Sequence, residues 1–195
     1  MKQFNDWKIS SKVISVFIAS VILLIIMVFS LLLPAIEDML MQDRMNKIRN
    51  LSEVAYGVID DFAKKAAAGE ISKEEAQTYA KEQIRTLRYD ENEYFWINDM
   101  HPTMIMHPFN MALEGKDLSG NADPNGKRLF VEFVNVCKAK SEGFVDYMWD
   151  KPGFSKPVPK ISFVKLFRDW EWIVGTGVYL DDVEAEMAGI RNKIL

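Results

Sequence analysis

The stretch that decides the fold is YFWINDMHPTMIMHP, residues 94–108. From Glu93 onward the repeat of the sequence changes to two, which is the side-chain period of a strand. Residues 94–98 and 103–107 hold aromatic and β-branched side chains, and a short Asp-Met-His-Pro connection separates them. Two such runs joined by a short turn predict a β-hairpin.

Three more strands are expected after the hairpin, at residues 143–149, 160–167 and 172–179. A loop rich in Gly, Asp and Asn at residues 114–126, a helix around residues 127–140 and a long turn at residues 150–159 lie between them. Two strands, a crossover and three further strands favour an α+β fold with a five-stranded antiparallel sheet.

Helices are expected before and after this sheet. Apolar residues between Leu40 and Ala66 recur at three, four or multiples of these, which predicts a long helix that Gly69 ends. Ser72 and Glu75 form a capping box that opens a second helix. A final helix is expected from Asp181 to the end of the chain.

Residues 13–33, VISVFIASVILLIIMVFSLLL, contain no charged residue. At about 1.5 Å per residue, such a helix covers roughly 30 Å, the thickness of a bilayer's hydrocarbon core. The run is too long for a signal peptide and lacks its cleavage site, so we expect one transmembrane helix. The flanking charges predict a cytoplasmic N-terminus and a periplasmic or extracellular remainder; they are Lys2, Lys8 and Lys12 before the span and Glu37 and Asp38 after it.

The composition argues against several classes of function. The 195 residues carry a net charge of −4 and no basic tract, which speaks against nucleic-acid binding. The single cysteine, Cys137, excludes an intrachain disulfide and has the helical spacing of a core residue. No GxSxG motif, P-loop or nucleophile–base pair is recognisable, so we expect no enzyme and no cofactor.

An ordered set of motifs runs through residues 34–190: LRYDENEYFWIN at 87–98, MHP at 106–108, EGKD at 114–117, NG at 125–126, GFVDYMW at 143–149, PKIS at 159–162 and WIVGTGVYLDD at 172–182. No single motif is specific, but together they resemble the single Cache domains of bacterial methyl-accepting chemotaxis proteins and sensor kinases. The resemblance implies a PAS-like five-stranded sheet packed on a long N-terminal helix. It also implies a pocket for a small ligand, commonly a short carboxylate such as acetate, propionate, lactate or pyruvate.

This organisation predicts five parts: a cytoplasmic N-terminus (1–12), the transmembrane helix (13–33), two sensor helices (34–90), a PAS-like ligand-binding core (91–182) and a C-terminal helix leading back to the membrane (183–195). We expect a homodimer through the long N-terminal helix. Receptors of this family continue into a second membrane helix and a signalling module, so the chain is either a receptor fragment or a free-standing anchored protein.

A carboxylate ligand needs a cation and directed donors in a partly apolar pocket. Strand alternation gathers such groups on one face of the sheet, where Gly175 and Gly177 leave room. Lys160 or Arg88 would supply the charge, other side chains the donors and the apolar wall. The predicted site comprises Arg88, Tyr94, Trp96, Met106, His107, Tyr147, Trp149, Lys160 and Ser162.

These residues also have purely structural interpretations. Arg88 can complement a helix dipole, and Lys160 can be a solvated lysine at a strand start. Tyr147 and Trp149 can be plain core residues. An interaction module without a small ligand is therefore the rival to the sensor: a filled sheet face would favour the module, and a walled cavity near Tyr94 would favour the sensor.

The two His-Pro pairs raise the question of a metal site. His101 falls in the hairpin turn and His107 near the end of the second strand, so the two rings should not converge. No cysteine or HxxxH spacing assists them, and we expect no metal and no metal-dependent enzyme. Pro108 lacks a backbone donor and should end the strand at the rim of the pocket, which leaves His107 facing a ligand.

Overall fold

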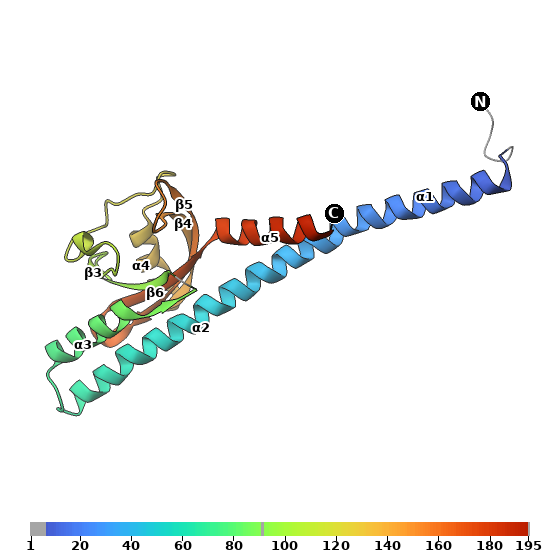
Figure 1. The fold of residues 1–195 in the computed structure, drawn as a ribbon. Helices are drawn as coiled ribbons and strands as arrows, with labels where there is room; N and C mark the ends of the chain where they lie inside the picture. Colours follow the sequence, from blue (N-terminus) through green and yellow to red (C-terminus); the bar gives the residue numbers. More distant parts are fainter. Residues whose placement is uncertain (1–6, 91, 195) are drawn as a thin grey trace.

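A computed structural model describes residues 7–90 and 92–194 (Figure 1). Residues 1–6 of the predicted cytoplasmic segment, with Lys2, lie outside the described residues, as do Glu91 and Leu195. One continuous helix runs from Ile9 to Ala67, as α1 (Ile9–Met27), the π-helical turn η2 (Val28–Leu32) and α2 (Leu33–Ala67). Within the described part of the chain, it is the one helix long and apolar enough to cross a membrane.

Pro34 does not break this helix. It is the second residue of α2, but because α1, η2 and α2 are continuous, its missing N–H falls inside the helix and not at a free N-terminus. The preceding turn is widened to the π form, in which the N–H of Leu33 donates to the carbonyl of Val28. None of the α1 side chains is buried within the described structure, so this chain does not cover the apolar surface of α1.

The sheet contains six strands among the described residues: β1 (Arg88–Tyr89), β2 (Glu93–Asp99), β3 (Met104–Met106), β4 (Glu142–Asp150), β5 (Pro157–Phe167) and β6 (Trp172–Tyr179). Their order is β1-β2-β6-β5-β4, with β3 pairing with β2, and every pairing is antiparallel. The predicted α+β fold with an antiparallel sheet beside a long N-terminal helix is confirmed. The short β1 was not predicted, because two residues show no period.

Helices cover the two faces of the sheet unequally. α2 and α3 (Lys73–Thr86) pack on one face, where Phe95 and Ile97 of β2 meet Ile59 and Ile84. α4 (Leu129–Lys140) covers the other face, where Trp96 meets Phe133 at a ring-centroid distance of 5.4 Å. β2 therefore alternates between two cores, as its period of two predicts.

α2 and α5 (Leu180–Ile194) run in opposite directions, so the C-terminal end of α5 lies toward the α1 end of the molecule (Figure 1). α5 begins directly after β6 and lies along α2, with Arg44 and Glu186 joined by an ion pair of 2.8 Å (Figure 1). α3 starts with the predicted capping box, in which Ser72 Oγ accepts from the N–H of Glu75 at 3.1 Å. The sheet therefore connects α5, which follows β6, with α2, which packs on one face of the sheet.

Candidate functional site

An aromatic box lies between α4 and the sheet. Tyr94 and Trp96 come from β2, Tyr147 and Trp149 from β4, and His107 directly follows β3. The space left inside it is about 10 Å³, lined by Tyr94, Trp96, Met104, His107, Leu129, Phe130, Phe133, Tyr147 and Trp149. Room of this size holds about one water molecule. The structure thus brings the predicted aromatic residues and His107 together, in a closed arrangement.

Hydrogen bonds fix the polar ends of these aromatic side chains. The indole N–H of Trp149 donates to the hydroxyl of Tyr94 at 2.9 Å, and the hydroxyls of Tyr147 and Ser162 lie 2.9 Å apart. Ser162 is fully buried, and burial also raises the pKa of Tyr147 well above its usual value. The box is therefore held in one geometry by polar contacts as well as by packing.

Lys160 is the one cation of the predicted set that the structure buries. It is 1% exposed, and none of the described residues makes a hydrogen bond to its Nζ. Nζ lies 4.2 Å from the ring centroids of both Tyr94 and Tyr179, which is cation–π geometry. A buried ammonium without a hydrogen-bonded partner is unfavourable, and Lys160 is not among the residues that line the inner space of the box.

Gly177 creates the space that Lys160 and Ser162 occupy. A Cβ at this position would lie 2.1 Å from Ser162 Oγ and 3.0 Å from Lys160 Cε. Gly175 does the same for Trp96, whose ring would be 2.4 Å from an added Cβ. The two glycines of the GTG stretch therefore admit side chains that lie flat on the sheet.

His107 is 4% exposed and stands at the rim of the box. Its Nδ1 accepts from the backbone N–H of Asn110 at 3.0 Å, so the neutral ring carries its proton on Nε2. Burial, and next the charge of Lys160, lower the pKa of His107 to about 4. The backbone N–H of His107 donates to Glu114, which Arg85 holds in a bidentate pair at 2.6 and 3.1 Å.

A second, wider hollow opens directly outside the box. Its volume is about 360 Å³, and it shares Tyr94, His107 and Trp149 with the inner space. Its outer wall consists of Phe109, Asn110 and residues 150–154. Trp149 therefore lies between a filled inner space and an outer hollow that is large enough for a small molecule.

The sequence model of the Cache domain family matches residues 28–195. This chain belongs to the Cache domain family. It is 42% identical to the methyl-accepting chemotaxis protein McpP of Pseudomonas putida over 96% of the chain, and 32% identical to the sensor histidine kinase MctS of Rhizobium johnstonii over 81%. The chain spans about a third of the length of these curated relatives, 34% in each case.

Two solved structures share the fold with a TM-score of 0.70 each. One is described as the periplasmic sensor domain of a chemotaxis protein; it is 53% identical, and the match covers 71% of this chain and 96% of that one. The other is a Cache chemosensory domain described for carboxylic acid recognition; it is 45% identical, with coverage of 73% and 97%. The predicted family is confirmed, and these neighbours are sensor domains rather than enzymes.

Four residues of the predicted site do not line the inner space of the box, namely Arg88, Met106, Lys160 and Ser162. Arg88 is exposed; its Nη1 donates to the carbonyls of Arg85 and Leu87, and its guanidinium stacks 4.9 Å from the ring of Phe109. Met106 was expected in the apolar wall, but it is buried on the opposite face, against α2 and α3.

Strand alternation puts Met104 and Met106 together on the face opposite His107, and the structure keeps Met106 there; a β-bulge in β3 moves Met104 instead. Ile97 pairs with Met106 and Asn98 with Met104, so Ile105 is an extra residue in β3. The bulge breaks the alternation and points Met104 into the box. Nothing in the sequence pattern signals this bulge.

Other lining residues of this Cache domain were not predicted. They are Met104 of β3 and the α4 residues Leu129, Phe130 and Phe133, because the sequence does not show on which face of the sheet the helix packs. His101 stays exposed in the hairpin turn, where Asp99 Oδ1 accepts from its backbone N–H at 2.8 Å. No group of three His, Cys, Asp or Glu residues in the described part of the chain could hold a metal ion.

Proposed function

We propose that this Cache domain senses a short-chain carboxylate such as acetate, propionate, lactate or pyruvate. The observation that carries the proposal is the buried Nζ of Lys160, which has aromatic faces around it and no hydrogen-bonded partner in the described structure. A carboxylate beside Nζ would make a charge-assisted hydrogen bond and offset the desolvation of both charges. The structural relative described for carboxylic acid recognition supports the same ligand class.

The other predicted residues take complementary roles around such a ligand. The hydroxyls of Tyr94 and Tyr147 and the Nε2–H of His107 are the donors, and Trp96 forms an apolar wall. Lys160 is the charge of the site, because Arg88 is occupied by backbone carbonyls and by Phe109 at the surface. His107 stays neutral at physiological pH, since its pKa is lowered to about 4.

Entry of the ligand requires the box to open. The inner space of about 10 Å³ is too small for acetate, so Trp149 must give up its hydrogen bond to Tyr94 and swing toward the outer hollow. Trp149 is only partly buried, which makes it the mobile member of the box. Closure of Trp149 over the ligand would exclude water from the ion pair with Lys160.

The same proposal places the chain in the cell membrane. Residues 13–33 span the bilayer from a cytoplasmic N-terminus, and the sheet lies on the periplasmic or extracellular side. The apolar, unburied surface of α1 supports this, since no part of the described chain covers it. α2 and α5 then carry the ligand signal toward the membrane, and two copies of α2 form the homodimer contact.

Thermal unfolding of the full chain in lipid nanodiscs tests the ligand class. Ligand at 100 times its Kd stabilises a protein by about 2.7 kcal/mol, so one of the C2 to C4 acids should raise the melting temperature. Lys160→Met should abolish the response, and Lys156→Met, at an exposed lysine just before β5, should keep it. If this panel has no effect while another ligand class does, the carboxylate assignment is wrong.

The nearly filled box is the one observation that favours the rival, an interaction module without a small ligand. In that case Lys160 and its aromatic neighbours are only a packed core. The rival predicts that neither the carboxylate panel nor any other small-molecule class changes the melting temperature; a contact between two copies of α2, for example at the exposed Val54, is common to both proposals.

A further inference from the structure

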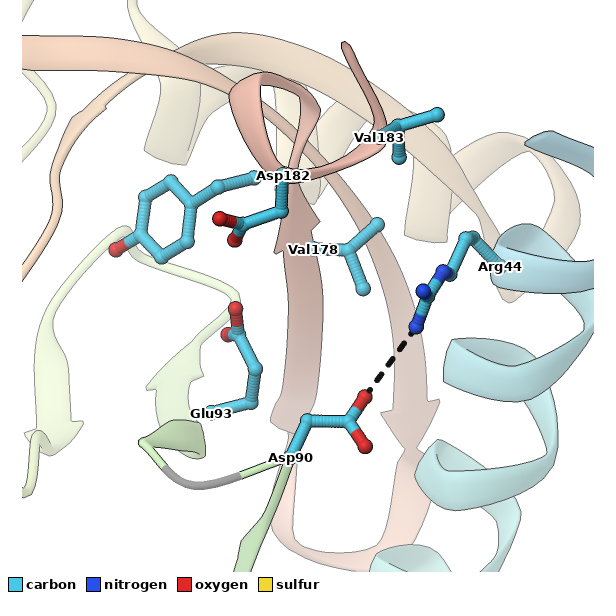
Figure 2. A pocket seen from close by; sticks show the side chains of 7 residues that line it. Arg44, Asp90, Glu93, Val178, Asp182 and Val183 are labelled. Carbon is cyan, nitrogen blue, oxygen red and sulfur yellow. Dashed lines mark ion pairs between the residues drawn. The ribbon is translucent and has the colours of Figure 1, made fainter. Parts of the chain in front are cut away.

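A separate hollow lies where α2, the segment before β2 and the start of α5 meet (Figure 2). Its volume is about 420 Å³, and it is on the membrane-proximal side of the sheet, beside the ion pair between α2 and α5. Its lining consists of Arg44, Asp90, Glu93, Val178, Tyr179, Asp182 and Val183. Acidic side chains thus outnumber basic ones in its wall.

Most charges around this hollow are already paired. Arg44 lies 3.6 Å from Asp90 and 2.8 Å from Glu186, and Lys47 also pairs with Asp90. Asp182 accepts from Lys151 at 2.6 Å. These paired carboxylates have little capacity left for a further cation.

Glu93 is the exception. The residue is 9% exposed, and no described residue makes a hydrogen bond to its buried Oε2. Figure 2 shows its carboxylate pointing into the hollow toward Asp182 and away from Asp90, which pairs with Arg44. An uncompensated carboxylate in this position carries a large desolvation cost, which a bound cation would offset.

The pKa of Glu93 agrees with this geometry. Burial raises it to about 7, while the positive charges of Lys160 and Lys151 lower it and the negative charges of Asp182 and Asp90 raise it. The other charged or titratable groups around the hollow are Arg44 and Lys47 on α2 and the Tyr179 hydroxyl at the end of β6. Glu93 therefore lacks a counterion strong enough to outweigh its burial.

We propose that this hollow is a second ligand site, which binds a small organic ammonium ion through the carboxylate of Glu93. The ammonium N–H groups donate to Glu93, and the carbon chain lies against Val178 and Val183. A bare metal ion does not suit the site, since the described residues offer no group of three metal ligands. The apolar wall instead matches a ligand with both a charge and a hydrocarbon part.

The position of the site gives the ligand a regulatory role. The hollow is bounded by α2 through Arg44 and by α5 through Asp182 and Val183. An occupant would therefore contact both helices that lead toward the membrane, independently of the aromatic box. Occupancy favours one spacing of these helices over another, which is the form of coupling that a two-site sensor needs.

The test uses the full chain in nanodiscs and propylammonium chloride as the probe, followed by isothermal titration calorimetry at about pH 8. Propan-1-ol controls for the hydrocarbon part and sodium chloride for ionic strength. Glu93→Gln should weaken propylammonium binding by at least about tenfold, because the charge-assisted hydrogen bond is lost. Glu184→Gln, at an exposed carboxylate of α5, should bind as the unmodified chain does.

The pH dependence gives a second measurement that needs no variant. Between about pH 8 and pH 5.5 a carboxyl group with a pKa of about 7 loses most of its charge, which predicts an affinity about 30-fold lower at the acidic end. The propylammonium ion remains charged throughout. Absence of binding, equal binding of propan-1-ol, full binding by Glu93→Gln, or an affinity that is unchanged at about pH 5.5 would each overturn the proposal.

Discussion

Replacement of Lys160 by methionine should stabilise the protein while it removes carboxylate binding. The side chain is 1% exposed, and its Nζ has no hydrogen-bonded partner among the described residues. Methionine keeps a long, unbranched side chain in the same space and removes the buried charge. Stability and ligand binding are therefore expected to change in opposite directions at this one position.

The size of the effect follows from opposing contributions. Burying an unpaired ammonium costs several kcal/mol. The rings of Tyr94 and Tyr179, each 4.2 Å from Nζ, offset this by about 1–2 kcal/mol each. The remainder, reduced by the loss of the attraction between Lys160 and Glu93, predicts that Lys160→Met raises the free energy of unfolding by about 1–3 kcal/mol. For a chain of this length each kcal/mol corresponds to a melting temperature about 2–4 °C higher.

Intrinsic tryptophan fluorescence of the full chain in nanodiscs would follow the unfolding, with and without acetate or propionate. Lys156→Met is the matched control, and its stability should stay within about 0.5 kcal/mol of the unmodified chain because Lys156 is exposed. A melting temperature below that of the unmodified chain, or a full carboxylate response in Lys160→Met, would refute the reasoning.

Three further predictions concern the glycine below Lys160 and two buried titratable groups. Gly177→Ala should destabilise the protein by about 1–3 kcal/mol, because the added Cβ would lie 2.1 Å from Ser162 Oγ. Gly57→Ala in α2 should instead stabilise it by up to about 1 kcal/mol, because nothing lies within 4 Å of the added Cβ. Chemical denaturation measures both changes. The folded-state pKa of Glu93 is raised to about 7, so its contribution to stability is lost as pH rises from about 4.5 to 7, and the stability of Glu93→Gln relative to the unmodified chain should rise with pH in that range. The folded-state pKa of His107 is lowered to about 4, so the contribution of His107 to stability is lost as pH falls from 6.5 to about 4. The stability of His107→Gln relative to the unmodified chain should therefore fall as pH rises in that range. Parallel pH profiles of the two variants in thermal unfolding would contradict both assignments.

Local periodicity predicted the placement of the β2 side chains well. Tyr94 and Trp96 face the box, while Phe95 and Ile97 face α2 and α3, as an alternation of two requires. The prediction works because this strand is buried on both faces and pairs regularly with β6. The direction of each side chain is then set by the backbone of the strand itself.

The same reasoning failed at β3, because a bulge depends on how two strands pair and not on one strand alone. Ile105 is accommodated as an extra residue, so Met104 and Met106 lie on opposite faces of the sheet although alternation puts them on the same face. The charge of the site shows a related limit. The sequence does not distinguish Arg88 from Lys160 as the cation of the site. Only the tertiary packing, which exposes Arg88 and buries Lys160, separates them.

The two buried, unsatisfied charges connect the aromatic box to the hollow beside α5. Lys160 lies between the rings of Tyr94 and Tyr179, and its positive charge lowers the pKa of Glu93. An anion bound to Lys160 would cancel part of that field and favour the protonated form of Glu93. Since Tyr179 is the last residue of β6 and α5 begins at Leu180, the same event would act at the start of α5. Ligand binding and the charge state between α2 and α5 are then linked through three neighbouring side chains, and by reciprocity a cation on Glu93 changes the affinity of the box for its anion.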